Sequence, residues 1–144
     1  MTAIAFHFNA SDRLAYACRL LRKAVASGAK IVVTGSPDAL QQLDIMLWVF
    51  SATDFVPHCQ LASDATLVAA SPVIMAASTE AAPYQEVLLN LGDQVPNGFE
   101  KFERVVEIVT LDEEDRQSAR SRWKQYADAG YAITRHDLIL RASQ

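Results

Sequence analysis

The amino-acid sequence predicts a three-layer, Rossmann-like α/β fold with a mainly parallel sheet and helices on both faces. Short apolar runs of strand length alternate along the chain with segments whose apolar residues recur every three or four positions. Glycine, or serine followed by proline, marks several boundaries between them. Strands that alternate with helices are typical of parallel sheets, because each helix carries the chain back across a face of the sheet. The pattern leaves the order of the strands open.

Length and charge bound the architecture and the partners. A chain of 144 residues with 51% hydrophobic content is the size of one domain with a substantial core, so we expect a single domain over residues 1–144. Thirteen Lys and Arg residues against seventeen Asp and Glu residues give a formal net charge of −4. A negative overall field repels phosphate, so the composition disfavours direct, non-specific binding of nucleic acid.

The cysteines and the first residues indicate a cytoplasmic protein. Cys18 and Cys59 have no CxxC spacing and no histidine at ligand distance in the sequence, which favours free thiols in a reducing compartment. The N-terminal residues include no basic leader, and their apolar run ends after a few positions. We therefore expect neither a signal peptide nor a membrane span, and a cytoplasmic location.

The first half of the chain is predicted to form strand, helix, strand and helix. Ser11 is expected to cap the first helix and Gly28 to end it. Ser36 and Pro37 are typical of the cap and the first turn of the second helix. The predicted elements are a strand at Ala3–Phe8, a helix between Ser11 and Gly28, a strand at Lys30–Thr34 and a helix from Pro37 to about Phe50.

The second half continues the alternation after an irregular middle segment at 51–71. Phe99 and Phe102 indicate a short helical piece after the turn-rich GDQVPNG. Asp112 is expected to cap a long helix that Gly130 ends. The predicted strands lie at Pro72–Ala76, Val87–Leu91 and Arg104–Val109, with a candidate edge strand at Tyr131–Ile133.

The motifs of nucleotide binding and catalysis are absent from the sequence. The strand-to-helix turns contain neither GxGxxG nor a Walker-type lysine loop, and there is no GxSxG nucleophile elbow. His7, His58 and His136 belong to separate segments without an HExxH pattern, which favours structural or surface roles. The acidic run at 112–115 falls in a first helical turn, where carboxylates interact favourably with the helix dipole. We therefore predict no catalytic residue, no metal site and no cofactor.

The predicted helix from Asp112 to Ala129 places cations beside an aromatic ring. The residues on this side of the helix are Arg116, Arg120, Trp123 and Lys124. An indole wall with three cations beside it suits an acidic peptide that carries an apolar anchor. The alternative is that Trp123 belongs to the core and that the cations pair with first-turn acids, for example Arg116 with Asp112. Spacing alone favours this alternative.

The predicted helix at 37–50 is apolar on more than one face. A sufficient core stripe is formed by Leu40, Leu43, Leu47 and Phe50. The apolar residues that point elsewhere are Ile45, Trp48 and Val49, and the following loop adds Phe55, Val56 and Pro57. Either the middle segment or a partner must cover them, and the length of that segment favours cover from within the chain.

Several stretches together resemble one family, the chi subunit of DNA polymerase III. The most specific combination is DFVPH at 54–58 following the Leu-Trp pair at 47–48, together with RxRWKxYxxxGY at 120–131. Weaker matches are the LxxLDxxLW-like run at 40–48, PVIM at 72–75, LLNL at 88–91 and FERVVEIV at 102–109. These pieces keep the family's order and spacing over nearly the entire chain.

The resemblance implies a non-catalytic accessory subunit that binds the extreme C-terminal tail of single-stranded DNA-binding protein. That tail is an acidic peptide ending in an apolar dipeptide and a free carboxylate. Matched position by position, the tail site would comprise Arg116, Arg120, Trp123 and Lys124, with Val109 as a candidate pocket wall. Trp123 and Val109 would contact the terminal ring, whereas Arg120 and Lys124 would neutralise the carboxylate and the acidic residues. Some relatives carry tyrosine where this chain has Trp123, which keeps the stacking wall and changes its hydrogen-bond donor.

The resemblance also implies pairing with the psi subunit of the clamp loader. The matching residues are Trp48, Phe55, Val56 and Pro57, which accounts for a helix too apolar for its core alone. Without a psi subunit, these residues would be covered within the chain, contact another clamp-loader component or form a self-association surface. Nucleic acid would be reached only indirectly, through the single-stranded DNA-binding protein, and no membrane contact is expected.

Two other classes of function compete with the adaptor. A small Rossmann-like enzyme would need an atypical nucleotide site in the cleft at the carboxyl ends of the strands, and no loop residue supports one. Direct binding of single-stranded DNA would need a basic groove with several stacking aromatics. The chain offers instead one basic stripe with a single tryptophan and a net charge of −4.

Overall fold

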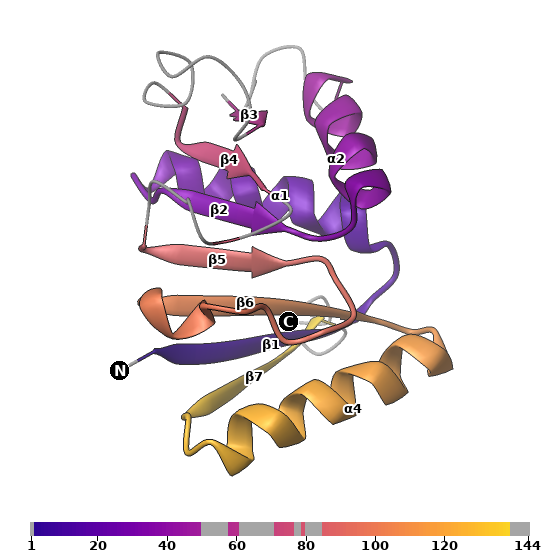
Figure 1. Cartoon of the computed structure of the whole chain (residues 1–144). Coiled ribbons are helices and arrows are strands. Elements are labelled where there is room, and N and C mark those ends of the chain that lie inside the picture. The colour runs from indigo at the N-terminus through magenta and orange to yellow at the C-terminus, as the bar shows by residue number, and fades with distance from the viewer. Residues whose placement is uncertain (1, 50–57, 61–70, 77–78, 80–84, 139–144) are drawn as a thin grey trace.

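The computed structural model describes residues 2–49, 58–60, 71–76, 79 and 85–138 (Figure 1). The elements in chain order are β1 (Ala3–Ala10), α1 (Arg13–Ala26), β2 (Ile31–Thr34), α2 (Pro37–Val49), β3 (His58–Gln60), β4 (Val73–Met75), β5 (Val87–Asn90), the 3-10 helix η1 (Phe99–Lys101), β6 (Arg104–Thr110), α4 (Glu113–Asp128) and β7 (Ile133–Asp137). The strands form one sheet in the order β3-β4-β2-β5-β6-β1-β7, and every strand pair is parallel. The predicted α/β class is confirmed.

Two separate cores make the fold three-layered. On one face of the sheet, α1 and α2 bury Cys18, Leu21 and Leu43 against strand residues such as Val33. On the other face, α4 buries Tyr126 and Ala119 against β1 and β6. Figure 1 shows α4 lying along β6, β1 and β7, away from α1 and α2. Helices therefore cover both faces, as the alternation of strands and helices predicts.

The helix ends follow the predicted signals with one correction. Ser11 was expected to cap the first helix, but Asp12 is the cap, because its carboxylate accepts a hydrogen bond from the Ala15 amide at 3.0 Å. Asp112 caps α4 in the same way. Gly28 and Gly130 follow the ends of α1 and α4 with φ of 89° and 87°, where a side chain would be strained.

The five main predicted strands are present, and two features of the sheet differ from the prediction. The segment expected to be irregular contains the short strand β3, a three-residue piece without an apolar run. The edge strand near the C-terminus was expected at Tyr131–Ile133 and lies instead at Ile133–Asp137. Its sequence ITRHD is mostly polar, which is possible because β7 pairs with one neighbour only, β1, and is not enclosed on both sides.

Neither a membrane span nor a metal cluster is found in the part of the chain that the structure describes. No helix there is long and apolar enough to cross a bilayer. No group of three or more His, Cys, Asp or Glu residues there could hold a metal ion. Cys18 is buried against the α1 face of the sheet, and burial raises the pKa of its thiol to about 11, which keeps it protonated.

Candidate functional site

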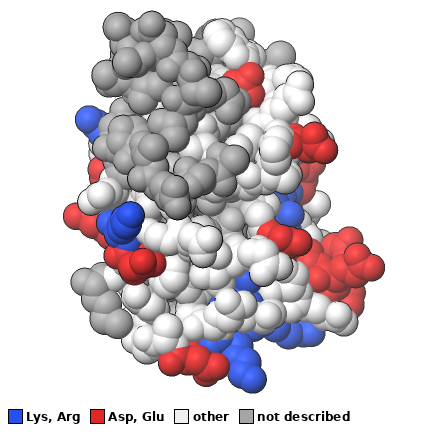
Figure 2. Space-filling model, viewed as in Figure 1, with Lys and Arg blue, Asp and Glu red and all other residues white. Residues whose placement is uncertain are grey.

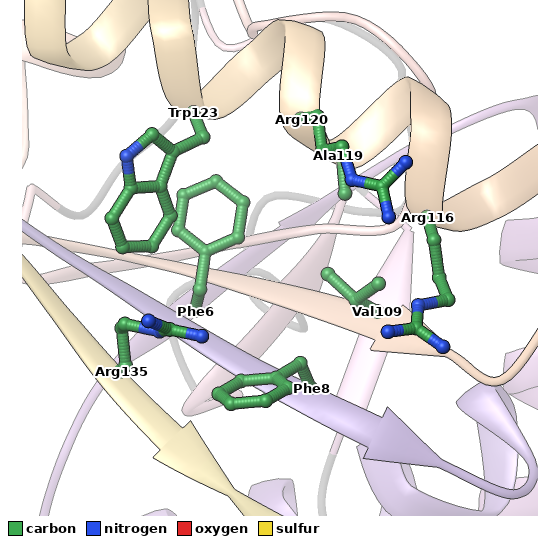
Figure 3. Close-up of a pocket in the computed structure, with 8 residues that line it drawn as sticks. All are labelled: Phe6, Phe8, Val109, Arg116, Ala119, Arg120, Trp123 and Arg135. Carbon is green, nitrogen blue, oxygen red and sulfur yellow. The ribbon is translucent and has the colours of Figure 1, made fainter.

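A pocket of about 380 Å³ lies between α4 and the strands β1, β6 and β7 (Figure 3). Its lining combines an apolar floor with cationic walls. The residues that line it are Phe6, Phe8, Val109, Arg116, Ala119, Arg120, Trp123 and Arg135. The structure thus brings together four of the five predicted tail-site residues.

Local geometry explains how these side chains converge. Phe6 and Phe8 are two residues apart in β1, so both point to the face of the sheet that α4 covers. On α4, the spacing of three, one and three residues puts Arg116, Ala119, Arg120 and Trp123 along one side of the helix. The pocket therefore forms where the β1 side chains that point toward α4 face the side chains on one side of that helix.

The Trp123 ring has both of the roles that the sequence left open. It is half-buried, and its centroid lies 5.0 Å from that of the buried Phe6 ring. It also borders the pocket, and the Arg135 guanidinium carbon lies 5.8 Å from its centroid. One face of the indole can therefore anchor the wall of the pocket while the remaining surface stays available to a ligand.

The pairing of cations with first-turn acids, which the core alternative expected, is found for Arg120 and not for Arg116 among the described residues. Asp112 caps the helix, and no ion pair joins it to Arg116 among the described residues. Arg120 does contact Glu113 at 3.5 Å, but both side chains are more than 60% exposed, so solvent screens this pair strongly. Lys124 is exposed on α4 and does not line the pocket.

The electrostatic character of the pocket is positive. Its lining includes three arginines and no acid. Figure 2 shows acidic side chains gathered at the end of the molecule where α4 begins, and basic side chains along the lower edge, where the helix continues. A chain with a negative net charge therefore presents a local cationic site.

Four lining residues were missed from the sequence. Phe6 and Phe8 alternate along β1, and Ala119 lies on the same helical stripe as Trp123. These patterns predict a pocket only once it is known that β1 lies under α4. Arg135 was missed because β7 was expected to end at Ile133. Sequence alternation alone could have paired Phe6 with Phe8.

The second predicted surface is partly described. On α2, Leu43 and Leu47 are buried, and Ile45 and Trp48 point away from this core stripe, as the helical pattern predicts. Ile45 is 55% and Trp48 is 62% exposed, so the cover that was expected from within the chain leaves more than half of each side chain exposed. The Trp48 ring lies 5.5 Å from that of His58, at an angle of 66°. Phe55, Val56 and Pro57 lie outside the described residues, so the extent of this surface around Trp48 remains a prediction.

Two of the three histidines meet in the fold. Parallel pairing of β1 with β7 brings His7 and His136 together, with ring centroids 4.5 Å apart, and His7 Nδ1 shares a hydrogen bond with the Tyr16 hydroxyl. His58 Nε2 lies 3.0 Å from an Asp44 carboxylate oxygen. The pair at His7 was not predicted, since strand order decides which segments meet.

Comparison with known proteins gives one consistent result. A model of the family described as DNA polymerase III chi subunit, HolC, matches residues 1–134. DNA polymerase III subunit chi of Pseudomonas aeruginosa is 31% identical over 143 residues, which cover 96% of this chain and 98% of the relative. The corresponding subunit of Haemophilus influenzae is 26% identical over 82% of this chain and 82% of the relative. That of Escherichia coli is 26% identical over 81% of this chain and 79% of the relative. The chain therefore belongs to the DNA polymerase III chi subunit family.

Proposed function

We propose that this chain binds the acidic C-terminal tail of single-stranded DNA-binding protein in the pocket between α4 and the sheet. The observation that carries the proposal is the lining, where an apolar floor of Phe6, Val109 and Trp123 lies among three arginines without an acid. An apolar terminal side chain would be removed from water on the floor, while the arginines would neutralise the carboxylates. The site therefore suits a peptide that is apolar at its end and acidic before it.

The size of the pocket agrees with a short peptide end. Its volume of about 380 Å³ lies near the lower end of the range for small-ligand sites, about 300–1,000 Å³. It would hold a terminal residue and its carboxylate, with the acidic residues before them outside. Lys124, exposed one turn beyond Arg120, is placed to attract those acidic residues rather than to touch the terminal ring.

Family membership makes the chain a non-catalytic accessory subunit of DNA polymerase III. This replaces the nucleotide-binding enzyme that a Rossmann-like fold left open. A replication subunit of this kind works in the cytoplasm, where both the polymerase and the single-stranded DNA-binding protein act on the chromosome. Its contact with nucleic acid would be indirect, through the tail that it binds.

The exposed part of α2 would supply the second contact, to psi or to an equivalent clamp-loader component. Ile45 and Trp48 are large apolar side chains that remain more than half exposed, whereas the leucines on another side of the same helix are buried in the core. Aromatic residues of this kind are enriched at the centres of protein interfaces. With the tail pocket on α4 and this patch on α2, one small domain would join two partners at separate surfaces.

Titration with a tail peptide tests the proposal. The purified chain is titrated by calorimetry with a peptide of the last ten or so residues of the single-stranded DNA-binding protein from the same organism, and with the same peptide lacking its final residue. We expect the intact peptide to bind with an affinity that falls as salt rises, because exposed charges are screened. The truncated peptide should not bind at comparable concentrations.

The outcomes separate cleanly. Binding that requires the final residue supports a pocket for the chain end, whereas binding that is unchanged by truncation would show that only the acidic residues matter. Absence of binding by the intact peptide at low salt would overturn the tail-site proposal and leave the chain in its family without this partner.

A further inference from the structure

We propose that Arg135, on β7, binds the terminal carboxylate of the tail, and that Phe8 and Trp123 hold its guanidinium in place to do so. This inference rests on the proposed tail-binding function and adds the residue that would recognise a free chain end. Arg135 does not belong to the residues that the family resemblance assigned, and it approaches the pocket from a different element than Arg116 and Arg120.

The guanidinium of Arg135 lies close to two aromatic side chains. Its central carbon lies 5.0 Å from the centroid of Phe8 and 5.8 Å from that of Trp123. Both distances are within the range of cation–π attraction, about 6 Å. A side chain as long as arginine normally loses much rotamer freedom when it binds a ligand, and these contacts remove part of that freedom beforehand.

Among the described residues, the N–H groups of Arg135 have no hydrogen-bond partner. Cation–π contacts use the two faces of the planar guanidinium, whereas its N–H groups point outward in the plane. A carboxylate can accept two parallel hydrogen bonds from that edge, which is the strongest arrangement for this pair of groups. A primary amide at the end of a peptide cannot replace it, because one of its two positions is a donor.

The other two arginines are placed for a different part of the ligand. Arg120 already contacts Glu113 at 3.5 Å. Arg116 stands one turn from the acidic start of α4, where Asp112, Glu113 and Glu114 reduce the local positive potential. Arg135 has no ion pair among the described residues. It also lies on β7, outside the acidic first turn of α4.

The close-up view is consistent with a two-sided site. In Figure 3 the guanidinium groups of Arg135 and Arg116 extend into the pocket from opposite sides, with Phe8 and Val109 between them. A terminal residue with its side chain on this floor would have its carboxylate beside one arginine and its preceding acidic residues toward the other. We assign the carboxylate to Arg135 and the acidic residues to Arg116 and Arg120.

A comparison of two peptides across three proteins tests this assignment. The tail peptide is prepared with a free C-terminal carboxylate and with a C-terminal amide, and each is titrated into the wild-type chain, Arg135→Gln and the matched control Arg116→Gln. We expect the wild type to prefer the free carboxylate by roughly tenfold to a hundredfold, as for loss of a charge-assisted hydrogen bond. Arg135→Gln should bind both peptides with nearly equal, reduced affinity.

The control decides between a specific contact and general charge. Arg116→Gln should weaken both peptides by a similar factor and keep the preference for the carboxylate. Arg135→Lys, which retains the charge without the planar fork, should restore only part of that preference. Because Arg135 is exposed, all variants should keep the unfolding midpoint of the wild type, measured in the same preparations.

Failure of the inference differs from failure of the proposed function. If the wild type binds the tail and Arg135→Gln still prefers the free carboxylate as strongly, the assignment to Arg135 is wrong while the tail site stands. If that preference disappears in Arg116→Gln instead, the two arginines have exchanged roles. If the wild type binds neither peptide, the tail function itself fails.

Discussion

The Arg122 and Glu107 side chains form an ion pair inside the protein, with 3.1 Å between Nε and Oε1 and side-chain exposures of 2% and 0%. Glu107 also accepts hydrogen bonds from Asn90 at 3.0 Å and from the Tyr126 hydroxyl at 2.7 Å. Burial and the neighbouring carboxylate raise the pKa of Tyr126 well above its ordinary value, so its hydroxyl stays protonated as a donor. This network attaches α4, and with it the wall of the pocket, to β6.

Removing one partner of this pair should destabilise the whole domain. Arg122→Met leaves the Glu107 carboxylate buried without its counter-charge, and we expect a loss of about 3–5 kcal/mol in the free energy of unfolding. Urea denaturation followed by circular dichroism measures it. The double variant Arg122→Met with Glu107→Gln removes both charges, keeps an acceptor for the Tyr126 hydroxyl and should lose less. A single variant as stable as the wild type would show that the pair contributes nothing net.

Asp115 should make the stability of the domain depend on acid. Its carboxylate accepts hydrogen bonds from the Thr110 amide at 2.7 Å and hydroxyl at 2.9 Å, and it pairs with Arg13. Partial burial raises the pKa of Asp115, but these bonds outweigh it and hold the pKa below the ordinary value of 3.8. A lowered pKa contributes stability above the unfolded-state value, and this contribution is lost as pH falls through the folded-state value.

The measurement compares the wild type with Asp115→Asn over a range of pH. Near neutral pH the variant should be less stable by about 1–3 kcal/mol, since the amide loses the charge-assisted bonds. The difference should shrink as the pH falls below about 3.8, where the unfolded chain takes up a proton at this position. It should level off below the folded-state pKa, where the folded carboxyl is protonated as well. A difference that is constant over the whole range would contradict this account.

Trp123→Ala should abolish most tail binding without unfolding the protein. The ring forms a wall of the pocket and is half-buried on Phe6, so the variant loses contact area and keeps the cores on both sides of the sheet. We expect peptide affinity to fall by about 1–3 kcal/mol. Trp48→Ala is the matched control, because it removes a tryptophan outside the pocket and should leave the affinity unchanged. Loss of the fold in Trp123→Ala would favour a purely structural role.

Trp48→Ser should weaken binding to the clamp loader and not to the tail. The ring is 62% exposed, so its loss should change the free energy of unfolding by less than about 1 kcal/mol. Co-purification with clamp-loader subunits from the same organism measures the partner contact, and sedimentation of the chain alone tests self-association. Ser121→Ala, an exposed change on α4, serves as the control. Equal recovery of the clamp loader by Trp48→Ser would reject this surface.

The sequence by itself determined most of the strands and helices, and which apolar residues exceed what a core needs. Apolar periodicity and capping residues act locally, so β1, α1, β2, α2, β5, β6 and α4 could be predicted from neighbouring residues. Trp48 was predicted to point away from the core, because another face of its helix already supplies a sufficient apolar stripe.

Only the tertiary structure decided which of these segments meet. Strand order is set by packing across the whole sheet, so no local pattern placed β1 between β6 and β7 or brought Phe6 and Phe8 under Trp123. The polar edge strand β7 carried no apolar run, and Arg135 became a pocket residue only through its parallel pairing with β1. The burial of Arg122 against Glu107 likewise depends on the tertiary structure, because a buried charge needs a counter-charge that another element supplies.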